Sequence, residues 1–405
     1  MPIEESLVEL AELAASAGAE IVERVLQSRP KPEAATLVGE GKVEELAAAV
    51  KSNSADVVIF DHDLSPTQQR NLEKAVQAKV IDRTQLILDI FASRARTREG
   101  RLQVELAQLS YLLPRLSGHG VEMSRLGGGI GTRGPGETKL ETDRRRIAKR
   151  IKKISDDLEA VRAGRALHRQ RRVAVPLATL ALAGYTNAGK STMFNRLTRA
   201  EVLTDARMFA TLDPTVRPLT LPSRRRVLIS DTVGFIRNLP TTLVKAFRAT
   251  LEEVTEAALV LHVVDVSSDS AAEHTAHVRK VLAEIGAADL PQIIVANKVD
   301  RLSLDDAEAL PKRLVGGAED AAKARVVAVS ALTGNGIAEL LRAIDAMLPV
   351  DPLVKVTLKV QSGDGATQAM LHEFGRVLST RYDGEVCEIE AEIPESLSRR
   401  LPATL

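Results

Sequence analysis

One octapeptide constrains this chain more than any other feature. Gly184–Ser191 has the sequence Gly-Tyr-Thr-Asn-Ala-Gly-Lys-Ser, which fits the pattern G-x-x-x-x-G-K-[ST]. The apolar run Leu177–Ala183 precedes it and the apolar-periodic segment Met193–Leu197 follows it. We therefore expect a strand, a phosphate-binding loop and a helix, in that order. A chance glycine-rich turn is the alternative, but a chance turn does not require these two neighbours.

The loop predicts roles for its residues. Its backbone N–H groups would curl around phosphates at a helix N-terminus. Lys190 would reach the outer phosphates, and the Ser191 hydroxyl would hold Mg²⁺. The nucleotide-binding residues predicted here are Gly184, Tyr185, Thr186, Asn187, Ala188, Gly189, Lys190, Ser191 and Thr192.

Composition limits the other functions that are open to the chain. Apolar residues make up 44% and aromatic residues 2%, so the cores must be aliphatic. The net charge is +1, and a polyanion-binding surface must therefore be local. Cys387 is the only cysteine, which excludes intrachain disulfides and cysteine-based zinc sites. The chain begins without a signal-peptide pattern and has no apolar run near ~20 residues. We expect a soluble, cytoplasmic monomer without a membrane span.

The pattern of apolar residues predicts an α/β protein in four parts, with boundaries at residues 1–95, 96–175, 176–348 and 349–405. Residues 1–95 alternate helical and strand-like pieces, which favours a small α/β domain with parallel strands. The predicted helices are Glu5–Ala15, Lys42–Val50 and Gln68–Val76, and the predicted strands are Glu20–Leu26 and Ala55–Phe60. One continuous helical pattern then covers Gln85–Leu113.

Residues 96–175 predict a helical hairpin around a glycine-rich loop. Eight of the nineteen residues 118–136 are glycine, which predicts a flexible loop. The polar helix expected over Lys139–Arg172 holds thirteen Lys or Arg against five acidic residues. Its apolar residues form one stripe, made of Leu140, Ile147, Ile151, Ile154 and Leu158. The basic helix could contact RNA, and a solvated helix face is the alternative. The glycine loop could also contact RNA, and an inert linker is the alternative.

The last two parts predict a nucleotide domain and a small α/β C-terminal unit. Near-continuous apolar runs favour a mostly parallel sheet covered on both faces. Its expected strands are Ala178–Ala183, Arg226–Ser230, Leu259–Val266, Gln292–Ala296 and Val326–Val329, with a hairpin from Arg217–Leu221. The C-terminal unit has strand patterns at Leu353–Val360 and Val386–Ile393 around a helix near Thr367–Phe374.

Further motifs follow the phosphate loop in the order that GTP-binding proteins use. Asp231-Thr232-Val233-Gly234 ends one strand, where a carboxylate can hold a Mg²⁺-bound water and the Gly234 N–H can face the γ-phosphate. Asn297-Lys298-Val299-Asp300 ends another, where Asp300 can accept both N1–H and N2–H of guanine. Adenine would leave that carboxylate unpaired. Ser330-Ala331-Leu332 would complete the guanine site.

A switch threonine should lie between Ser191 and Asp231. We expect Thr211 to be the second Mg²⁺ ligand, with Thr215 as its rival. The segment predicted to line the nucleotide is Phe209, Ala210, Thr211, Leu212 and Asp213. Lys190, Thr211 and Gly234 are the expected catalytic residues.

The ordered set of motifs indicates a GTPase, because the motifs meet where open α/β sheets bind ligands. Phe235 stands where many small GTPases carry a water-orienting glutamine. A phenyl ring cannot polarise water, so we expect a low intrinsic rate and acceleration by a partner. In several GTPases with asparagine at the position of Asn187, a K⁺ ion replaces an arginine finger. A K⁺ cofactor is therefore a hypothesis, and a purely structural Asn187 is its alternative.

One long motif makes the interpretation more specific. Gly127–Ile147, which contains Gly-Gly-Gly-Ile-Gly-Thr-Arg-Gly-Pro-Gly-Glu-Thr-Lys, resembles the hallmark segment of the HflX family of translational GTPases. Other segments are similar to the same family, namely Gly184–Ser191, Phe209–Thr215, Asp231–Pro240, Gly39–Leu46, Phe60–Arg70 and Ile81–Glu105. The unit after Pro349 resembles an extension that only some members carry.

The resemblance implies a GTPase that binds the large ribosomal subunit and separates stalled or idle ribosomes into subunits. It implies that the N-terminal domain and the hairpin face ribosomal RNA, with the glycine loop toward the peptidyl transferase centre. A GTP-gated RNA-binding assembly scaffold without splitting activity is the alternative. ATP-driven RNA remodelling has only Gly39–Lys42 in its favour, and that segment lacks the spacing of a phosphate loop.

Overall fold

The computed structural model of the chain describes most of its residues, with several gaps. The described residues are 3–118, 135–172, 177–199, 208–209, 211–237, 253–303, 314, 325–348, 351–398 and 401. Within them the protein is a mixed α/β structure, and the predicted fold class is confirmed. None of the helices in these residues is both long and apolar enough to cross a membrane.

The N-terminal domain is built on a two-stranded parallel sheet. Its elements are α1 (Ile3–Ser16), α2 (Glu40–Asn53), β1 (Val57–Phe60), α3 (Pro66–Val76), β2 (Lys79–Asp82) and α4 (Arg83–Arg94). The three predicted helices and the strand at Ala55–Phe60 are confirmed, and β1 pairs in parallel with β2. The four-residue strand β2 was not predicted. The strand predicted at Glu20–Leu26 is wrong: this segment is not paired with another strand, and apolar Val22 is 55% exposed.

The continuous helix predicted over Gln85–Leu113 is also wrong. The chain forms two helices, α4 and α5 (Arg98–Leu112), which are separated by an extended Ala95. Thr97 starts the second helix, because its hydroxyl accepts a hydrogen bond from the Gly100 amide at 2.9 Å. A side chain of this kind satisfies one of the unpaired amides of a first helical turn.

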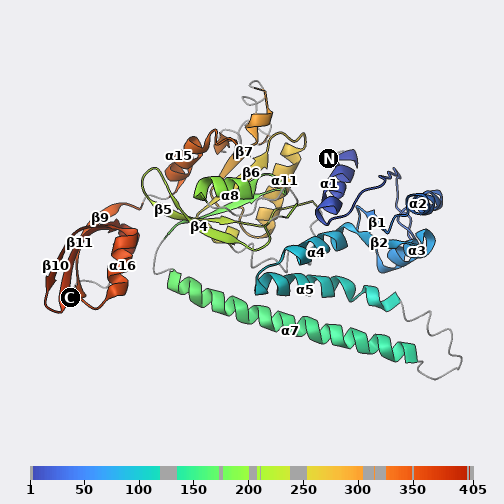
Figure 1. Ribbon diagram of the computed structural model, residues 1–405, viewed down its shortest axis with the longest axis horizontal. Coiled ribbons are helices and arrows are strands. Elements are labelled where there is room, and N and C mark those ends of the chain that lie inside the picture. Colours follow the sequence, from blue (N-terminus) through green and yellow to red (C-terminus); the bar gives the residue numbers. More distant parts are fainter. Residues whose placement is uncertain are drawn as a thin grey trace.

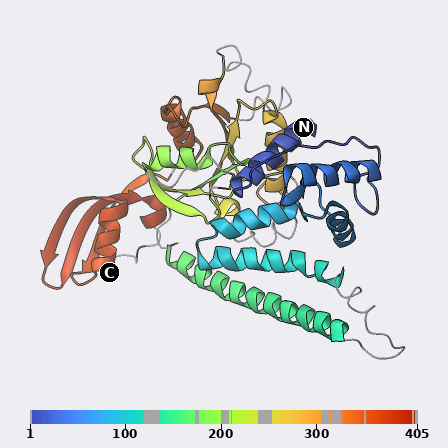
Figure 2. The ribbon, with the colours of Figure 1, turned by 45° about the vertical axis from the view of Figure 1, so that its right-hand side comes forward.

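The hairpin prediction is confirmed in its helices. Helix α7 (Pro135–Arg172) runs antiparallel beside α5, and both views show the pair along the lower side of the molecule (Figures 1 and 2). Ile154 and Leu158 of the predicted stripe are buried. Arg150 forms two hydrogen bonds with Glu105 of α5, at 2.7 and 2.9 Å. The prediction of a flexible glycine loop falls mostly on residues 119–134, outside the described part of the chain, and α7 already begins at Pro135.

The nucleotide domain contains a six-stranded sheet of order β4-β5-β3-β6-β7-β8. Only the β4–β5 pair is antiparallel within this sheet. Its elements are β3 (Thr179–Gly184), α8 (Lys190–Thr198), β4 (Thr215–Thr220), β5 (Arg226–Asp231), β6 (Leu259–Asp265), α11 (Ala271–Glu284), β7 (Gln292–Asn297), η2 (Val299–Arg301), β8 (Arg325–Ala328) and α15 (Ile337–Met347). The five predicted strands and the predicted hairpin are confirmed.

The strand order places the end of β3 at a special point of the sheet. Strand β3 pairs with β5 on one side and with β6 on the other, and the chain crosses from the first side to the second between β5 and β6. At such a reversal the connections leave in opposite directions and open a crevice at the carboxyl ends of the strands. Gly184, the last residue of β3, begins the phosphate loop at this crevice.

Two clusters of buried apolar side chains cover the two faces of the sheet. On one face, Met193 and Phe194 of α8 and Ile344 of α15 pack against the strands. On the other face, Val278 of α11 belongs to one continuous cluster that also contains Leu13 of α1. The N-terminal domain and the nucleotide domain therefore share an apolar core.

The C-terminal unit is a separate small layer of sheet and helix, at one end of the molecule (Figure 2). Its elements are β9 (Leu353–Gln361), α16 (Gly365–Phe374), β10 (Arg376–Asp383), β11 (Val386–Pro394) and α17 (Glu395–Ser398). The sheet is antiparallel with the order β10-β11-β9, and β10 was not predicted. Cys387 lies in the core of this unit.

Candidate nucleotide site

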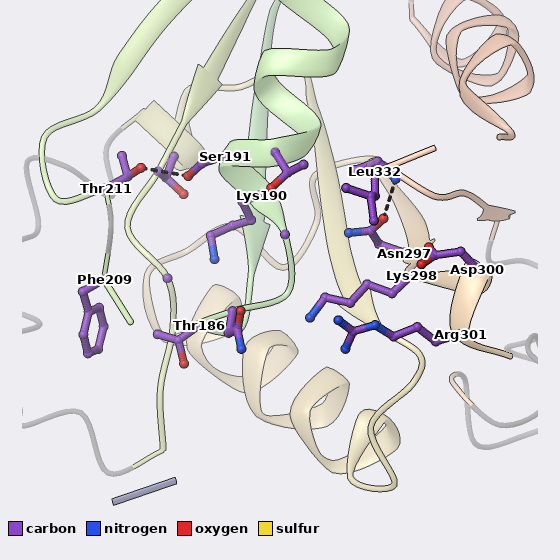
Figure 3. Close-up of a pocket in the computed structure, with 16 residues that line it drawn as sticks. Thr186, Lys190, Ser191, Phe209, Thr211, Asn297, Lys298, Asp300, Arg301 and Leu332 are labelled. Atoms are coloured by element: carbon purple, nitrogen blue, oxygen red, sulfur yellow. Dashed lines mark hydrogen bonds between the residues drawn. The ribbon is translucent and has the colours of Figure 1, made fainter. Parts of the chain in front are cut away.

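A cavity of about 410 Å³ opens at the carboxyl ends of the parallel strands. Ser191 and Thr211 lie at one end, Asp300 and Leu332 at the other, and Lys190 lies between them (Figure 3). The residues that line it are Thr186, Asn187, Gly189, Lys190, Ser191, Thr192, Phe209, Thr211, Thr232, Gly234, Asn297, Lys298, Asp300, Arg301, Ala331 and Leu332. The structure thus brings together five segments from distant parts of the sequence.

Two positions of the phosphate loop require glycine, because atoms of neighbouring strands lie too close to leave room for a side chain. Gly189 has φ +93°, and a Cβ there would lie 2.3 Å from Nδ2 of Asn297. Gly184 passes so near β6 that a Cβ would lie 2.3 Å from the Val263 carbonyl oxygen. A side chain at either position would force the loop away from the neighbouring strand ends.

Lys190 is buried and turned back toward the loop. Its Nζ donates to the carbonyl oxygens of Gly184, at 3.1 Å, and of Tyr185, at 2.8 Å. Burial lowers the pKa of Lys190 to about 8, against the opposing effect of the Asp231 carboxylate. A phosphate group in the cavity would favour the charged form of this amine, because it adds negative charge next to a desolvated ammonium.

Three side-chain oxygens converge at one end of the cavity. The Ser191 Oγ lies 2.8 Å from Oδ2 of Asp231, and the Thr211 Oγ1 lies 2.9 Å from both. Oδ1 of Asp231 is buried and has no hydrogen-bond partner among the described residues. Burial raises the pKa of Asp231, while Lys190 opposes this shift. Small oxygen ligands around an incompletely satisfied carboxylate fit Mg²⁺, which prefers oxygen ligands and retains water.

The segment after Asp231 is fixed by backbone contacts with the phosphate loop. The Thr186 amide donates to the Phe235 carbonyl oxygen at 2.7 Å, and the Phe235 amide donates to the Gly184 carbonyl oxygen at 3.0 Å. Gly234 lines the cavity, and a Cβ there would lie 3.0 Å from the Lys190 Nζ. The Phe235 ring is 1% exposed, so it presents no polar group to the cavity.

The opposite end of the cavity is organised by Asn297. Its Nδ2 donates to the Ala188 carbonyl oxygen at 2.8 Å, and its Oδ1 accepts from the Ala331 amide at 2.9 Å. Asn297 therefore ties the phosphate loop to the Ser330–Leu332 loop. The Lys298 Nζ forms an ion pair with Asp265 at 2.5 Å, and the Asp300 side chain is exposed at the cavity wall. Arg301 also lines the cavity; its position next to the motif was the only available signal, and it was not predicted.

Some predicted site residues lie outside the lining of the cavity. They are Gly184, Tyr185, Ala188, Leu212, Asp213, Asp231, Val233, Val299 and Ser330, while Ala210 lies outside the described residues. Asp231 still takes part through Ser191 and Thr211. Leu212 and Val233 belong to the apolar core.

Two of these residues have side chains committed to other parts of the molecule. The Tyr185 hydroxyl donates to Glu9 of α1 at 2.8 Å. The Asp213 carboxylate accepts hydrogen bonds from the Arg96 and Thr97 amides, both at 2.9 Å. In this structure Asp213 faces helix α5 rather than the cavity, so a nucleotide contact by its side chain has no geometric support.

Comparison with known proteins agrees with this arrangement. Residues 4–92 match the model "GTP-binding GTPase N-terminal", residues 94–172 match "GTP-binding GTPase Middle Region" and residues 179–298 match "50S ribosome-binding GTPase". The GTPase HflX of Caldanaerobacter subterraneus is 47% identical over 98% of this chain and 90% of that protein.

The chain belongs to the HflX family of GTPases. The GTPase HflX of Escherichia coli is 46% identical over 91% of this chain and 85% of that protein. That of Alkalihalophilus pseudofirmus is 56% identical over 74% of this chain and 70% of that protein. The resemblance to HflX is confirmed, and so is the prediction of a GTPase: the protein binds GTP and hydrolyses it to GDP and phosphate.

Proposed function

We propose that this HflX-family GTPase binds the large ribosomal subunit and dissociates stalled or idle ribosomes into subunits in a GTP-dependent manner. The contact of Thr211 with Ser191 and Asp231 carries this proposal. Through it, Thr211 lies beside the place where the terminal phosphate of GTP would lie. A segment held in this way distinguishes GTP from GDP.

Five residues of the site receive a role in this proposal. Lys190 binds the outer phosphates, Ser191 and Thr211 hold Mg²⁺, and the Gly234 amide faces the γ-phosphate. Mg²⁺ neutralises charge on the β- and γ-phosphates during transfer. Asp300 pairs with the N1–H and N2–H of guanine. Loss of the Lys190 charge in Lys190→Ala removes nucleotide binding while leaving the fold intact.

The expected hydrolysis rate follows from the residue after Gly234, where a water-orienting side chain would stand. Phe235 occupies the position after Gly234 and is buried, so it does not orient the attacking water. We infer a low intrinsic rate that the ribosome stimulates. Asn187 is exposed at the cavity wall, so the carbonyl oxygen of its side chain is available to a monovalent cation such as K⁺.

The ribosomal partner is supported by the charge of the hairpin and by the family. Helix α7 carries the cluster of Lys and Arg, and Arg145 and Arg146 have side chains 75% and 77% exposed. Exposed cations along a helix bind the phosphates of RNA by releasing counterions. The model that matches residues 179–298 is described as a 50S ribosome-binding GTPase.

The proposed sequence of events uses binding energy first and hydrolysis second. The GTP-bound protein docks on the large subunit, and the energy of docking displaces inter-subunit contacts. Hydrolysis then loosens Thr211 and Gly234 and releases the protein. We place this activity in the cytoplasm, with the protein acting as a monomer.

Ribosome profiles in a sucrose gradient test the proposal. Intact ribosomes are incubated with the protein and either a non-hydrolysable GTP analogue or GDP, and Lys190→Ala serves as the matched control. We expect conversion of ribosomes to subunits with the analogue alone. Binding to ribosomes without conversion would favour the assembly scaffold. Equal conversion with GDP would contradict the proposed order of events.

A further inference from the structure

The segment Met208–Asp213, of which all residues except Ala210 are described, lies between the nucleotide cavity and the N-terminal half of the molecule. Thr211 faces the cavity and contacts Ser191 and Asp231. Two residues further on, Asp213 faces α5. Thr211 and Asp213 thus connect the site of nucleotide hydrolysis with the start of α5, the first helix of the hairpin.

Asp213 occupies the N-terminus of α5. Its Oδ2 accepts hydrogen bonds from the Arg96 and Thr97 amides, both at 2.9 Å, and its Oδ1 contacts the Thr97 hydroxyl. The carboxylate satisfies amides just before the helix and complements the positive end of the helix dipole. Helix α5 packs along α7, which carries the basic surface of the hairpin.

Gly100 shows how closely Asp213 approaches the helix. A Cβ at Gly100 would lie 2.4 Å from Oδ1 of Asp213. Glycine inside a helix is less favourable than alanine because it loses more backbone freedom on folding. The space that Gly100 leaves is therefore the space in which the Asp213 carboxylate lies.

The other end of the segment is held in an unfavourable backbone conformation. Phe209 has φ +57°, which an aromatic residue rarely adopts. Its ring packs edge-on against Phe91 of α4, with centroids 4.6 Å apart. The Met208 amide donates to the Ser16 hydroxyl of α1 at 2.9 Å. A conformation of this kind persists only where its surroundings maintain it, so loss of these contacts would favour release of the segment.

We propose that the described residues of Met208–Asp213 form a latch between the nucleotide site and the hairpin, and that Asp213 is the positioning residue that places Thr211. When Thr211 is held at the nucleotide, Asp213 caps α5; when Thr211 is released, the cap is lost. Coupling of this kind is reciprocal, so contacts made by the hairpin also change the order of Thr211. The inference rests on the proposed role of Thr211, but it does not require ribosome splitting.

Amide hydrogen exchange tests the latch, since the Arg96 and Thr97 amides both donate hydrogen bonds to Asp213. In the wild-type protein we expect these amides to exchange at least about fivefold more slowly with a GTP analogue than with GDP. In Asp213→Ala and Gly100→Ala the difference between the two nucleotides should fall to within about twofold. Gly41→Ala is the matched control, because a Cβ at this other helical glycine would meet no atom within 4 Å.

Affinities measured by calorimetry separate the latch from the proposed role of Thr211. Thr211→Ala should weaken the GTP analogue and spare GDP, and Asp213→Ala should do the same by about fivefold. Unchanged analogue affinity in Thr211→Ala would refute the role of Thr211. If Thr211→Ala weakens the analogue but Asp213→Ala does not, the latch is overturned and the role of Thr211 stands. Equal exchange of the two amides in both nucleotide states of the wild-type protein also overturns the latch.

Discussion

The nucleotide domain meets the N-terminal half of the molecule at two junctions of different chemistry. The first is the buried charge cluster, formed by Glu9, Asp61, Arg83, Tyr185 and Arg237. The second is the latch at Asp213. Both are connected to the nucleotide site along the chain, because Tyr185 belongs to the phosphate loop and Asp213 lies two residues after Thr211. They differ in burial and in the number of charges involved.

The buried charge cluster is desolvated and closely paired. Arg83 is 1% exposed and forms ion pairs with Glu9 at 2.9 Å and with Asp61 at 2.7 Å. The Tyr185 hydroxyl donates to Glu9 at 2.8 Å and accepts from the Arg237 amide at 2.9 Å. Burial raises the pKa of Tyr185, which keeps this hydroxyl protonated. Separation of these groups would leave uncompensated charge inside the protein.

Separating the groups of the latch should cost less free energy than separating those of the buried charge cluster. Its three hydrogen bonds join Asp213 to groups at a solvent-exposed helix end, where water can replace each partner. From this difference we expect the cluster to stay formed in both nucleotide states, whereas the proposed latch would open and close with the nucleotide.

The largest expected effect on stability comes from disrupting the buried charge cluster. Arg83→Ala removes the ion-pair partner of buried Glu9 and leaves Asp61 with Arg237, 3.5 Å away, which should cost about 3–5 kcal/mol of stability. Chemical denaturation of the nucleotide-free protein measures this cost. Arg145→Ala removes a 75% exposed partner of Glu141 and should cost less than about 0.5 kcal/mol. Similar costs for the two variants would contradict the strong pairing of Arg83 in the buried cluster.

A smaller change sharpens the contrast between the two junctions. Tyr185→Phe removes one hydroxyl from the cluster and leaves Glu9 with an unmade hydrogen bond, which should cost about 1–3 kcal/mol of stability. Since the cluster does not open with the nucleotide, the ratio of GTP-analogue affinity to GDP affinity should stay unchanged. A shifted ratio, determined by calorimetry, would assign part of the switching to the cluster.

The phosphate loop itself should show a pH dependence. Burial lowers the pKa of Lys190 in the free protein to about 8, and the negative charge of a bound phosphate should raise it. Nucleotide affinity is therefore fully present below pH 8 and falls by up to about tenfold for each pH unit above it. Calorimetry from pH 7 to 9.5 measures this slope. Lys190→Arg keeps its charge throughout and corrects for titration of the base; an equal slope in that variant would contradict the assignment.

The monovalent cation should have the smallest effect. If Asn187 helps to hold K⁺ at the cavity, hydrolysis is faster in KCl than in NaCl at equal ionic strength, and Asn187→Ala removes the difference. Phosphate release under multiple-turnover conditions measures both rates. Equal wild-type rates in the two salts would leave Asn187 with a structural role in the loop.

The nucleotide site was more predictable than the junctions, for a physical reason. Motifs such as Gly184–Ser191 lie next to strands whose apolar runs are visible in the sequence, and parallel strands bring their ends together. Glu9 and Tyr185 are 176 residues apart, and no local pattern links them. The break between α4 and α5 depends partly on Asp213, which is 116 residues from Thr97. The switch-threonine motif predicted Asp213 at the nucleotide, whereas the structure places it at α5.

Binding of the protein to isolated large ribosomal subunits tests the account most directly. The protein is sedimented with these subunits in the presence of either a non-hydrolysable GTP analogue or GDP, over a series of salt concentrations. We predict tight association with the analogue, weak association with GDP and a loss of both as salt rises, because basic residues meet RNA phosphate. Equal association with the two nucleotides would contradict the claim that the γ-phosphate controls binding.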